Sequence, residues 1–228
     1  TAQEYGFTRE AQDAFAAESV RRALAACNGG GFAKEIAPVT AKGRKGEVVV
    51  DKDETPFTLD VAKIPTLKPA FGKNGTVTAA SSSSISDGAS ALVLARESVA
   101  AKQGLKPLAR ILGYASFARE PEWFTLAPVG AIQKVLKQVG WQAGDVDLYE
   151  VNEAFAAVTM AAIKDLSLDP ARVNVNGGAC ALGHPVGATG ARITTTLIHA
   201  LAARGKKRGV AALCIGGGEA TALALELV

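Results

Sequence analysis

The chain has 228 residues, of which 48% are hydrophobic, so it can bury a core in one large domain or two smaller ones. Its 25 Lys and Arg residues against 22 Asp and Glu residues give a net charge of +3, too small to indicate binding to nucleic acid or a membrane. Three widely spaced cysteines without a CxxC pair predict neither disulfides nor a metal site, and they favour a reducing, cytoplasmic setting. No signal peptide or membrane-spanning stretch is expected.

The first part of the chain predicts helices and strands without a regular order. Apolar residues at helical spacing predict a helix over residues 7–26, which ends at a glycine cluster. Two short strands are expected over residues 35–41 and 48–51. The turn between them carries Arg44 and Lys45 between two glycines, and we interpret it either as a solvated hairpin tip or as a contact for phosphate.

Prolines and serines dominate the next stretch. Three prolines within residues 55–71 predict irregular structure with one short helix. A strand is expected over residues 75–79, and the serine run that follows has the composition of a flexible linker. Because that run leads directly into an apolar strand expected over residues 89–95 and a helix over 97–103, we predict instead that the serines line a pocket or a tight turn.

From residue 108 onward, strands and helices alternate regularly. We expect, in order, a strand over 108–115, a helix over 128–139, a strand over 146–151, a helix over 153–166, a strand over 173–175, a glycine-rich loop, a helix over 191–204, and strands over 209–215 and 220–227. This alternation predicts βαβ units in a layered α/β/α domain. The last two strands are separated only by three glycines and a glutamate, so they are expected to close a mixed sheet as an antiparallel hairpin.

The glycine-rich loop presents His184. Pro185 biases the histidine towards extended geometry, and Gly183 and Gly187 leave little bulk to block the approach of a ligand. The helix that follows would direct its positive N-terminal end towards the imidazole, which favours a neutral histidine that can act as a base. A structural loop with a hydrogen-bonded histidine is an equally good interpretation of this segment alone.

Two other polar residues follow predicted strands, at the carboxyl ends where α/β sheets bind ligands. Cys214 lies at the end of one strand, followed by Ile215 and three glycines, and the unobstructed backbone amides of this run are suitable donors to an oxyanion. The thiol is either an acid/base group or a small buried hydrophobic residue. Asn152 is either a helix cap or a ligand of a water or carbonyl oxygen.

Three motifs in this order carry a resemblance: Asn152-Glu153-Ala154-Phe155-Ala156, the loop from Gly177 to Pro185 that contains Gly-His-Pro, and Cys214-Ile215-Gly216-Gly217-Gly218. Together they resemble the thiolase family, acetyl-CoA C-acetyltransferases in particular. The resemblance covers the whole chain and matches the latter part of a thiolase. It implies a loop domain over residues 1–86 that binds coenzyme A, a returning segment of the N-terminal domain over 87–106, and a C-terminal domain over 107–228.

The resemblance also implies a ping-pong acyl transfer. Thiolases use a nucleophilic cysteine followed shortly by Ser-Gly, and none of the chain's three cysteines has that context. His184 would activate that nucleophile and, with a water held by Asn152, would form one oxyanion hole. Cys214 would move the proton at the α-carbon, and the Gly216 amide would contribute to the second oxyanion hole. We therefore expect a C-terminal portion without the nucleophile half, inactive as this fragment alone.

Coenzyme A is implied as substrate and product, with no covalently bound cofactor and no metal. The residues that match the family's contacts to coenzyme A are Phe71, Ala79, Ser83, Ala154 and Phe155. Thr55-Pro56-Phe57 stands where relatives often carry an arginine for the phosphate, which leaves Arg44 and Lys45 as candidates. Phe124 stands where bacterial biosynthetic members commonly have Met, which hints at a 2-methyl substrate.

The resemblance further implies a cytoplasmic homotetramer in fatty acid metabolism that acts on acyl-CoA. Two alternatives remain open. One is a degradative 3-ketoacyl-CoA thiolase for longer chains, and the other is a non-catalytic thiolase-like protein that binds acyl-CoA or lipid.

Overall fold

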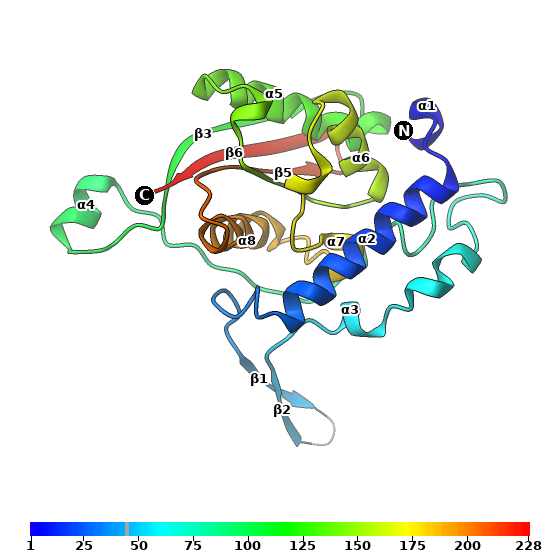
Figure 1. The fold of residues 1–228 in the computed structure, drawn as a ribbon, viewed down its shortest axis with the longest axis horizontal. Coiled ribbons are helices and arrows are strands. Elements are labelled where there is room, and N and C mark those ends of the chain that lie inside the picture. Colours follow the sequence, from blue (N-terminus) through cyan, green and yellow to red (C-terminus); the bar gives the residue numbers. More distant parts are fainter. Residues whose placement is uncertain (44–45) are drawn as a thin grey trace.

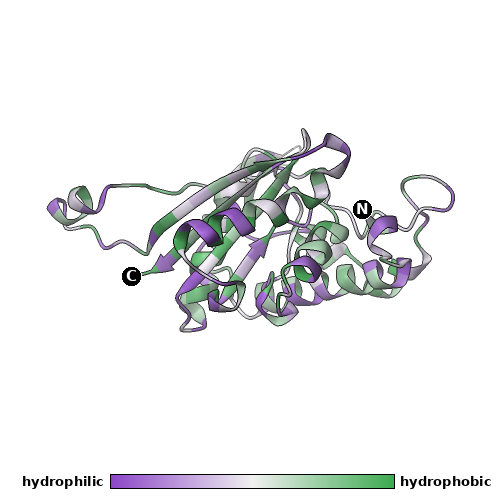
Figure 2. Cartoon of the chain, turned by 90° about the horizontal axis from the view of Figure 1, so that it is seen from above, coloured by the Kyte–Doolittle hydropathy of each residue, from purple (hydrophilic) through white to green (hydrophobic). Residues whose placement is uncertain are grey.

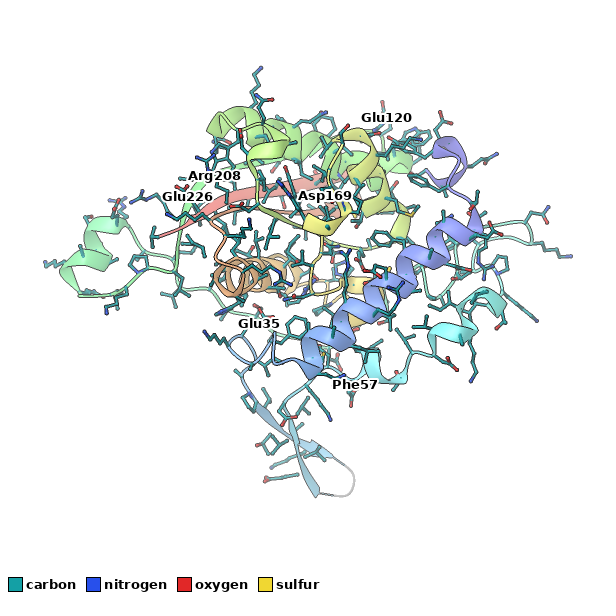
Figure 3. The ribbon with its side chains drawn as sticks, in the orientation of Figure 1. Glu35, Phe57, Glu120, Asp169, Arg208 and Glu226 are labelled. Carbon is teal, nitrogen blue, oxygen red and sulfur yellow. The ribbon has the colours of Figure 1, made fainter. Side chains whose placement is uncertain are left out.

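A computed structural model describes residues 1–43 and 46–228, so Arg44 and Lys45, the candidates for the coenzyme A phosphate, lie outside the described residues. Its centre is a four-stranded sheet in the order β3 (Ala109–Ala118), β6 (Glu219–Leu227), β5 (Arg208–Ile215) and β4 (Leu148–Val151). β6 runs antiparallel to both of its neighbours, whereas β4 and β5 are parallel. The predicted mixed sheet with a C-terminal antiparallel hairpin is confirmed, and Arg208 of β5 lies beside Glu226 of β6 at 3.5 Å (Figure 3).

Helices cover both faces of this sheet (Figure 1). α5 (Ala127–Val139) and α6 (Ala156–Asp165) pack on one face, where Ile132 and Val135 of α5 are fully buried. α8 (Thr189–Ala203) packs on the other face through Leu197 and Leu201. In Figure 2 the strands of the sheet are coloured mainly as hydrophobic, whereas the helices mix hydrophobic and hydrophilic residues along their length. The predicted layered α/β/α arrangement is confirmed.

Successive side chains of β4 point alternately to the face of the sheet covered by α5 and to the face covered by α8. Tyr149 and Val151 belong to the core beneath α5, whereas Leu148 belongs to the core beneath α8. Because successive strand residues point to opposite faces, Glu150 and Asn152 lie on the same side as Leu148. The β4 strand therefore delivers Asn152 to the face of the sheet that α8 covers.

The N-terminal part packs beside this layered body. α1 (Ala2–Tyr5) is followed by the long helix α2 (Arg9–Asn28), which the Thr8 hydroxyl caps by accepting from the Ala11 amide at 3.1 Å. The hairpin of β1 (Val39–Gly43) and β2 (Gly46–Val50) projects from the body (Figure 1). The remaining short elements are α3 (Thr55–Thr58), η1 (Val61–Thr66), α4 (Glu97–Lys102), η2 (Pro121–Leu126), η3 (Ala143–Asp145), η4 (Pro170–Arg172) and α7 (Ala179–Leu182).

Three predicted strands do not form, because within the described residues none of these segments makes a continuous hydrogen-bonded ladder with a neighbouring strand. Residues 75–79 are extended without strand pairing. Residues 89–95 are also extended and mostly exposed, with Val93 93% and Leu94 73% accessible, and they lead to α4, which stands away from the body in both views (Figures 1 and 2). Within 173–175 only an isolated bridge joins Val173 to Tyr149.

No helix within the described part of the chain is long and apolar enough to cross a bilayer.

Candidate active site

His184 is held by its backbone and by its side chain. Its amide donates to the Ser84 carbonyl at 2.9 Å, and its Nδ1 lies 2.6 Å from the Thr189 hydroxyl. That hydroxyl donates its own proton to the Pro185 carbonyl at 3.0 Å, so it can only accept from the imidazole. This arrangement favours the tautomer with the proton on Nδ1, which leaves the lone pair of Nε2 available as a base.

The surroundings of His184 keep the imidazole neutral. Burial lowers the pKa of His184, and the positive charge of Arg192 on α8 lowers it further. At neutral pH the ring is thus uncharged and ready to accept a proton, which agrees with its position before the N-terminal end of α8.

The Asn152 side chain is buried without a protein partner. It is 1% exposed, and neither Oδ1 nor Nδ2 makes a hydrogen bond to any residue the structure describes. The helix-cap interpretation is wrong, because α6 begins at Ala156 with Phe155 in the cap position. An unpaired buried amide costs about 1 to 3 kcal/mol, so this group points to a ligand or bound water as its partner.

Cys214 lies on the strand next to Asn152. The backbone amide of Asn152 donates to the Ala212 carbonyl of β5 at 2.9 Å. Asn152 and Cys214 therefore both lie at the carboxyl ends of neighbouring parallel strands. Burial raises the pKa of the Cys214 thiol to about 11, so it is protonated at neutral pH. Gly216 is exposed in the hairpin tip, where nothing crowds its α-carbon.

The serine run is an ordered strap between the two motifs. Ser82 forms an antiparallel bridge with Phe155, and both the amide and the hydroxyl of Ser83 donate to the Ala154 carbonyl at 3.1 Å. Farther along, Ile85 forms a parallel bridge with His184. The prediction that these serines are not a tether is therefore confirmed.

Three of the predicted substrate residues form an aromatic cluster. The Phe155 ring meets the ring of Phe71 edge to face at 6.1 Å between centroids and that of Phe124 at 6.4 Å. Aromatic pairs with this geometry contribute more to stability than the burial of their surface alone would give. Phe71 is nevertheless largely exposed, as is Ala79 on the chain between Phe71 and the serine strap.

Glu153 is a central residue that the sequence analysis did not single out. Its buried carboxylate accepts from the Ser19 hydroxyl at 2.7 Å, the Asn174 amide at 2.9 Å and the backbone amide of Cys180 at 3.1 Å. These bonds tie α2 and the loop before His184 to the Asn152 motif. The only signal in the sequence is a single acid between an apolar strand and an apolar helix.

Cys180 is buried between two alanines and serves packing. Burial and the adjacent Glu153 raise the pKa of its thiol well above the ordinary value, which makes it unreactive.

Together the fold and these side chains define a layered α/β/α protein with a neutral base, a protonated thiol and an unpaired amide at one end of its sheet. Comparison with known proteins agrees with this class. The thiolase N-terminal domain matches residues 1–98, and the thiolase C-terminal domain matches residues 105–227. The chain belongs to the thiolase family.

Individual relatives are similar over the whole chain. An acetyl-CoA acetyltransferase of Escherichia coli K12 is 52% identical over 99% of this chain and 57% of its own length. The crystal structure of the Bacillus anthracis acetyl-CoA acetyltransferase has a TM-score of 0.97 at 47% identity, over 100% of this chain and 58% of that one. The Ascaris suum Acat5 thiolase in complex with coenzyme A has a TM-score of 0.89 at 44% identity, with the same coverage. The chain thus spans somewhat more than half the length of the relatives it matches.

Proposed function

We propose that this chain is the part of an acetyl-CoA C-acetyltransferase that supplies the histidine and the acid/base cysteine for the interconversion of two acetyl-CoA with acetoacetyl-CoA and free CoA. The observation that carries the proposal is the pair of protonation states: His184 is a neutral base with Nε2 available, whereas Cys214 is a protonated thiol. One group accepts a proton and the other donates one, as acyl transfer with carbon–carbon bond cleavage requires.

In the thiolytic direction, His184 Nε2 takes the proton of a nucleophilic cysteine, which is not one of the three cysteines of this chain. The thiolate attacks the 3-keto carbon of acetoacetyl-CoA, and the bond between that carbon and the α-carbon breaks. The departing acetyl-CoA enolate takes the proton of the Cys214 thiol, which completes the first product. The thiol of free CoA then gives its proton to the Cys214 thiolate and attacks the acetyl carbon, while the bond from that carbon to the nucleophilic cysteine breaks and this cysteine takes its proton back from His184. The same steps reversed give the condensation.

Two oxyanion sites serve these steps. The unpaired Asn152 amide is suited to hold a water, which together with His184 stabilises the charge that develops on one thioester oxygen. The Gly216 amide serves the other oxygen from a hairpin tip without side-chain bulk. Coenzyme A would lie along the serine strap and the aromatic cluster, in contact with Phe71, Ala79, Ser83, Phe124, Ala154 and Phe155.

The test is thiolysis of acetoacetyl-CoA by the full-length gene product. His184→Ala and Cys214→Ala are each expected to lower kcat by about 100-fold or more, because each removes a proton-transfer group. His199→Ala is the matched control, since the second histidine of the chain lies on α8, ten residues after Thr189 and away from these groups. Thiolysis that survives both substitutions would contradict the proposal and favour a non-catalytic acyl-CoA-binding protein.

Phe124 favours one refinement of the substrate. Its ring packs against Phe155 within the aromatic cluster, so it shapes the apolar wall that an acyl chain would meet. We propose that this wall admits a 2-methyl group, and Phe124→Met should lower kcat/KM for 2-methylacetoacetyl-CoA relative to acetoacetyl-CoA. Faster thiolysis of long 3-ketoacyl-CoA than of acetoacetyl-CoA would instead assign the degradative activity.

A further inference from the structure

Thr189 is fully buried and is the first residue of α8. Its hydroxyl lies 2.6 Å from His184 Nδ1 and 3.0 Å from the Pro185 carbonyl. We propose that Thr189 is a positioning residue, which fixes both the tautomer and the orientation of the catalytic imidazole. The inference rests on the proposed function, because it concerns the base of that reaction.

The single proton of the Thr189 hydroxyl limits the bonds that it can donate. A hydroxyl group has one proton and two lone pairs, and the bond to the Pro185 carbonyl uses the proton. A carbonyl oxygen cannot donate, so the direction of this bond is certain. The contact to the imidazole must then use a lone pair of the hydroxyl, and Nδ1 must be the donor. The opposite tautomer would require the Thr189 hydroxyl to turn its proton from the Pro185 carbonyl to Nδ1 and so give up that bond.

Hydrogen bonds hold both the Thr189 hydroxyl and the His184 backbone in place. The Pro185 carbonyl lies four residues before Thr189, so their bond closes the turn that leads into α8. The histidine backbone is fixed from the other side by its bond to the Ser84 carbonyl. With the main chain and Nδ1 both held, rotation about χ1 and χ2 of His184 would break a partly buried hydrogen bond. Nε2 is therefore kept in one direction before any substrate binds.

Arg192 and Thr189 have opposite effects on the protonated form of His184. Arg192, also on α8, is the charged group that acts on His184 within the described part of the chain, and it disfavours the imidazolium. The Thr189 oxygen opposes this effect, because it accepts from Nδ1–H and that bond strengthens when the ring becomes positive. Thr189 thus supports the protonated intermediate that forms when the base takes a proton, whereas Arg192 keeps the resting base neutral.

The experiment compares three variants of the full-length gene product. Thr189→Val keeps the shape and removes the hydroxyl, Thr189→Ser restores the hydroxyl, and Thr194→Val is the matched control. Thr194 is a buried threonine of the same helix whose hydroxyl donates to the Gly190 carbonyl at 2.8 Å, also four residues back. The control therefore removes the same kind of helix bond without a contact to His184.

We expect Thr189→Val to lower kcat by about 10- to 100-fold, because the population of the productive tautomer falls. The acid limb of its kcat/KM profile should move to lower pH, since the imidazolium loses its acceptor. Thr189→Ser should return both values towards those of the unmodified protein, and Thr194→Val should leave the limb in place. An unmoved acid limb in Thr189→Val, or an equal shift in Thr194→Val, would overturn the proposal.

A readout that does not depend on activity separates this inference from the proposed function. Long-range 1H–15N correlation of protein labelled with 15N-histidine reports which ring nitrogen of His184 carries the proton, and His199→Gln assists the assignment. We expect the Nδ1–H form in the unmodified protein, even if thiolysis of acetoacetyl-CoA is absent. An Nε2–H form there would contradict the role of Thr189 without any variant that must fold.

Discussion

Glu150 is the residue at which burial most clearly sets the charge of a side chain. It lies on β4 two residues before Asn152, and burial raises its pKa to about 8, although Arg192 nearby opposes that change. Between about pH 4.5 and about pH 8 the folded protein therefore holds a proton that the unfolded chain has released. The contribution of Glu150 to the free energy of unfolding therefore falls as the pH rises through this window.

Glu150→Gln tests this statement. The variant has no carboxyl group to ionise, so it should lose less stability between about pH 5 and about pH 8.5, with a difference on the order of 2 kcal/mol. Urea unfolding at the two pH values measures the effect. Glu226→Gln is the control, because that carboxyl group lies at the partly exposed pair with Arg208 (Figure 3). Equal pH dependence in the unmodified protein and Glu150→Gln would contradict the assignment.

Some residues of the candidate site can be predicted from the sequence and others cannot, for a physical reason. Asn152, His184 and Cys214 each follow a predicted strand or loop signal, and the rule that ligands gather at carboxyl ends of strands selects them. Glu153 depends on partners as far away as Ser19, which no local pattern encodes. Thr189 lies near His184 in the chain, yet its role depends on the direction of one hydroxyl bond, which only coordinates reveal.

At the scale of elements, the position of the loop before His184 depends on two glycines that lie very close to neighbouring side chains. Gly178 lies against the Glu153 carboxyl group, and a β-carbon at that position would overlap with it. Gly183 lies in the same way against the Ser86 hydroxyl. These two contacts bring the loop onto the Asn152 motif on one side and onto the serine strap on the other.

Gly178→Ala should therefore destabilise the protein by about 1 to 3 kcal/mol, the usual cost of overpacking a buried site. Gly187→Ala, in the same loop, has open space around its α-carbon and should change stability by about 0.5 kcal/mol or less. Thermal or urea unfolding of both variants checks the difference. If the two substitutions cost the same, the contact between Gly178 and Glu153 does not determine the loop.

Helices and strands were predicted correctly where a segment with a clear apolar pattern packs against elements near it in the chain. The helix over residues 128–139 and the C-terminal hairpin formed as expected, since each buries its apolar residues against neighbouring elements. The apolar run 89–95 reads as a buried strand by composition, but it lies exposed. Burial of a strand requires a second strand, and that requirement cannot be met by the run itself.

For the whole molecule, this exposed run has a consequence for solubility. Within the part of the chain that the structure describes, no backbone hydrogen bond joins residues 89–95 to another segment. Val93 and Leu94 are 93% and 73% exposed, and Ile85 just before them is 94% exposed. Extended backbone with free amides and apolar side chains is a template for pairing between molecules. We therefore expect the 228-residue chain by itself to self-associate and, lacking a cysteine in the nucleophile context, to show no thiolysis.

Val93→Lys should reduce this self-association, because a charged side chain on an unpaired strand opposes pairing with a second copy. Val186→Lys is the matched control, since Val186 is a 67% exposed valine outside the run and the substitution adds the same charge. Light scattering of the two variants at equal concentration measures the difference. If both substitutions raise solubility equally, net charge is responsible rather than the run. A monodisperse unmodified chain would show that residues 89–95 need no partner at all, and thiolysis by that chain would place a nucleophile among its own three cysteines.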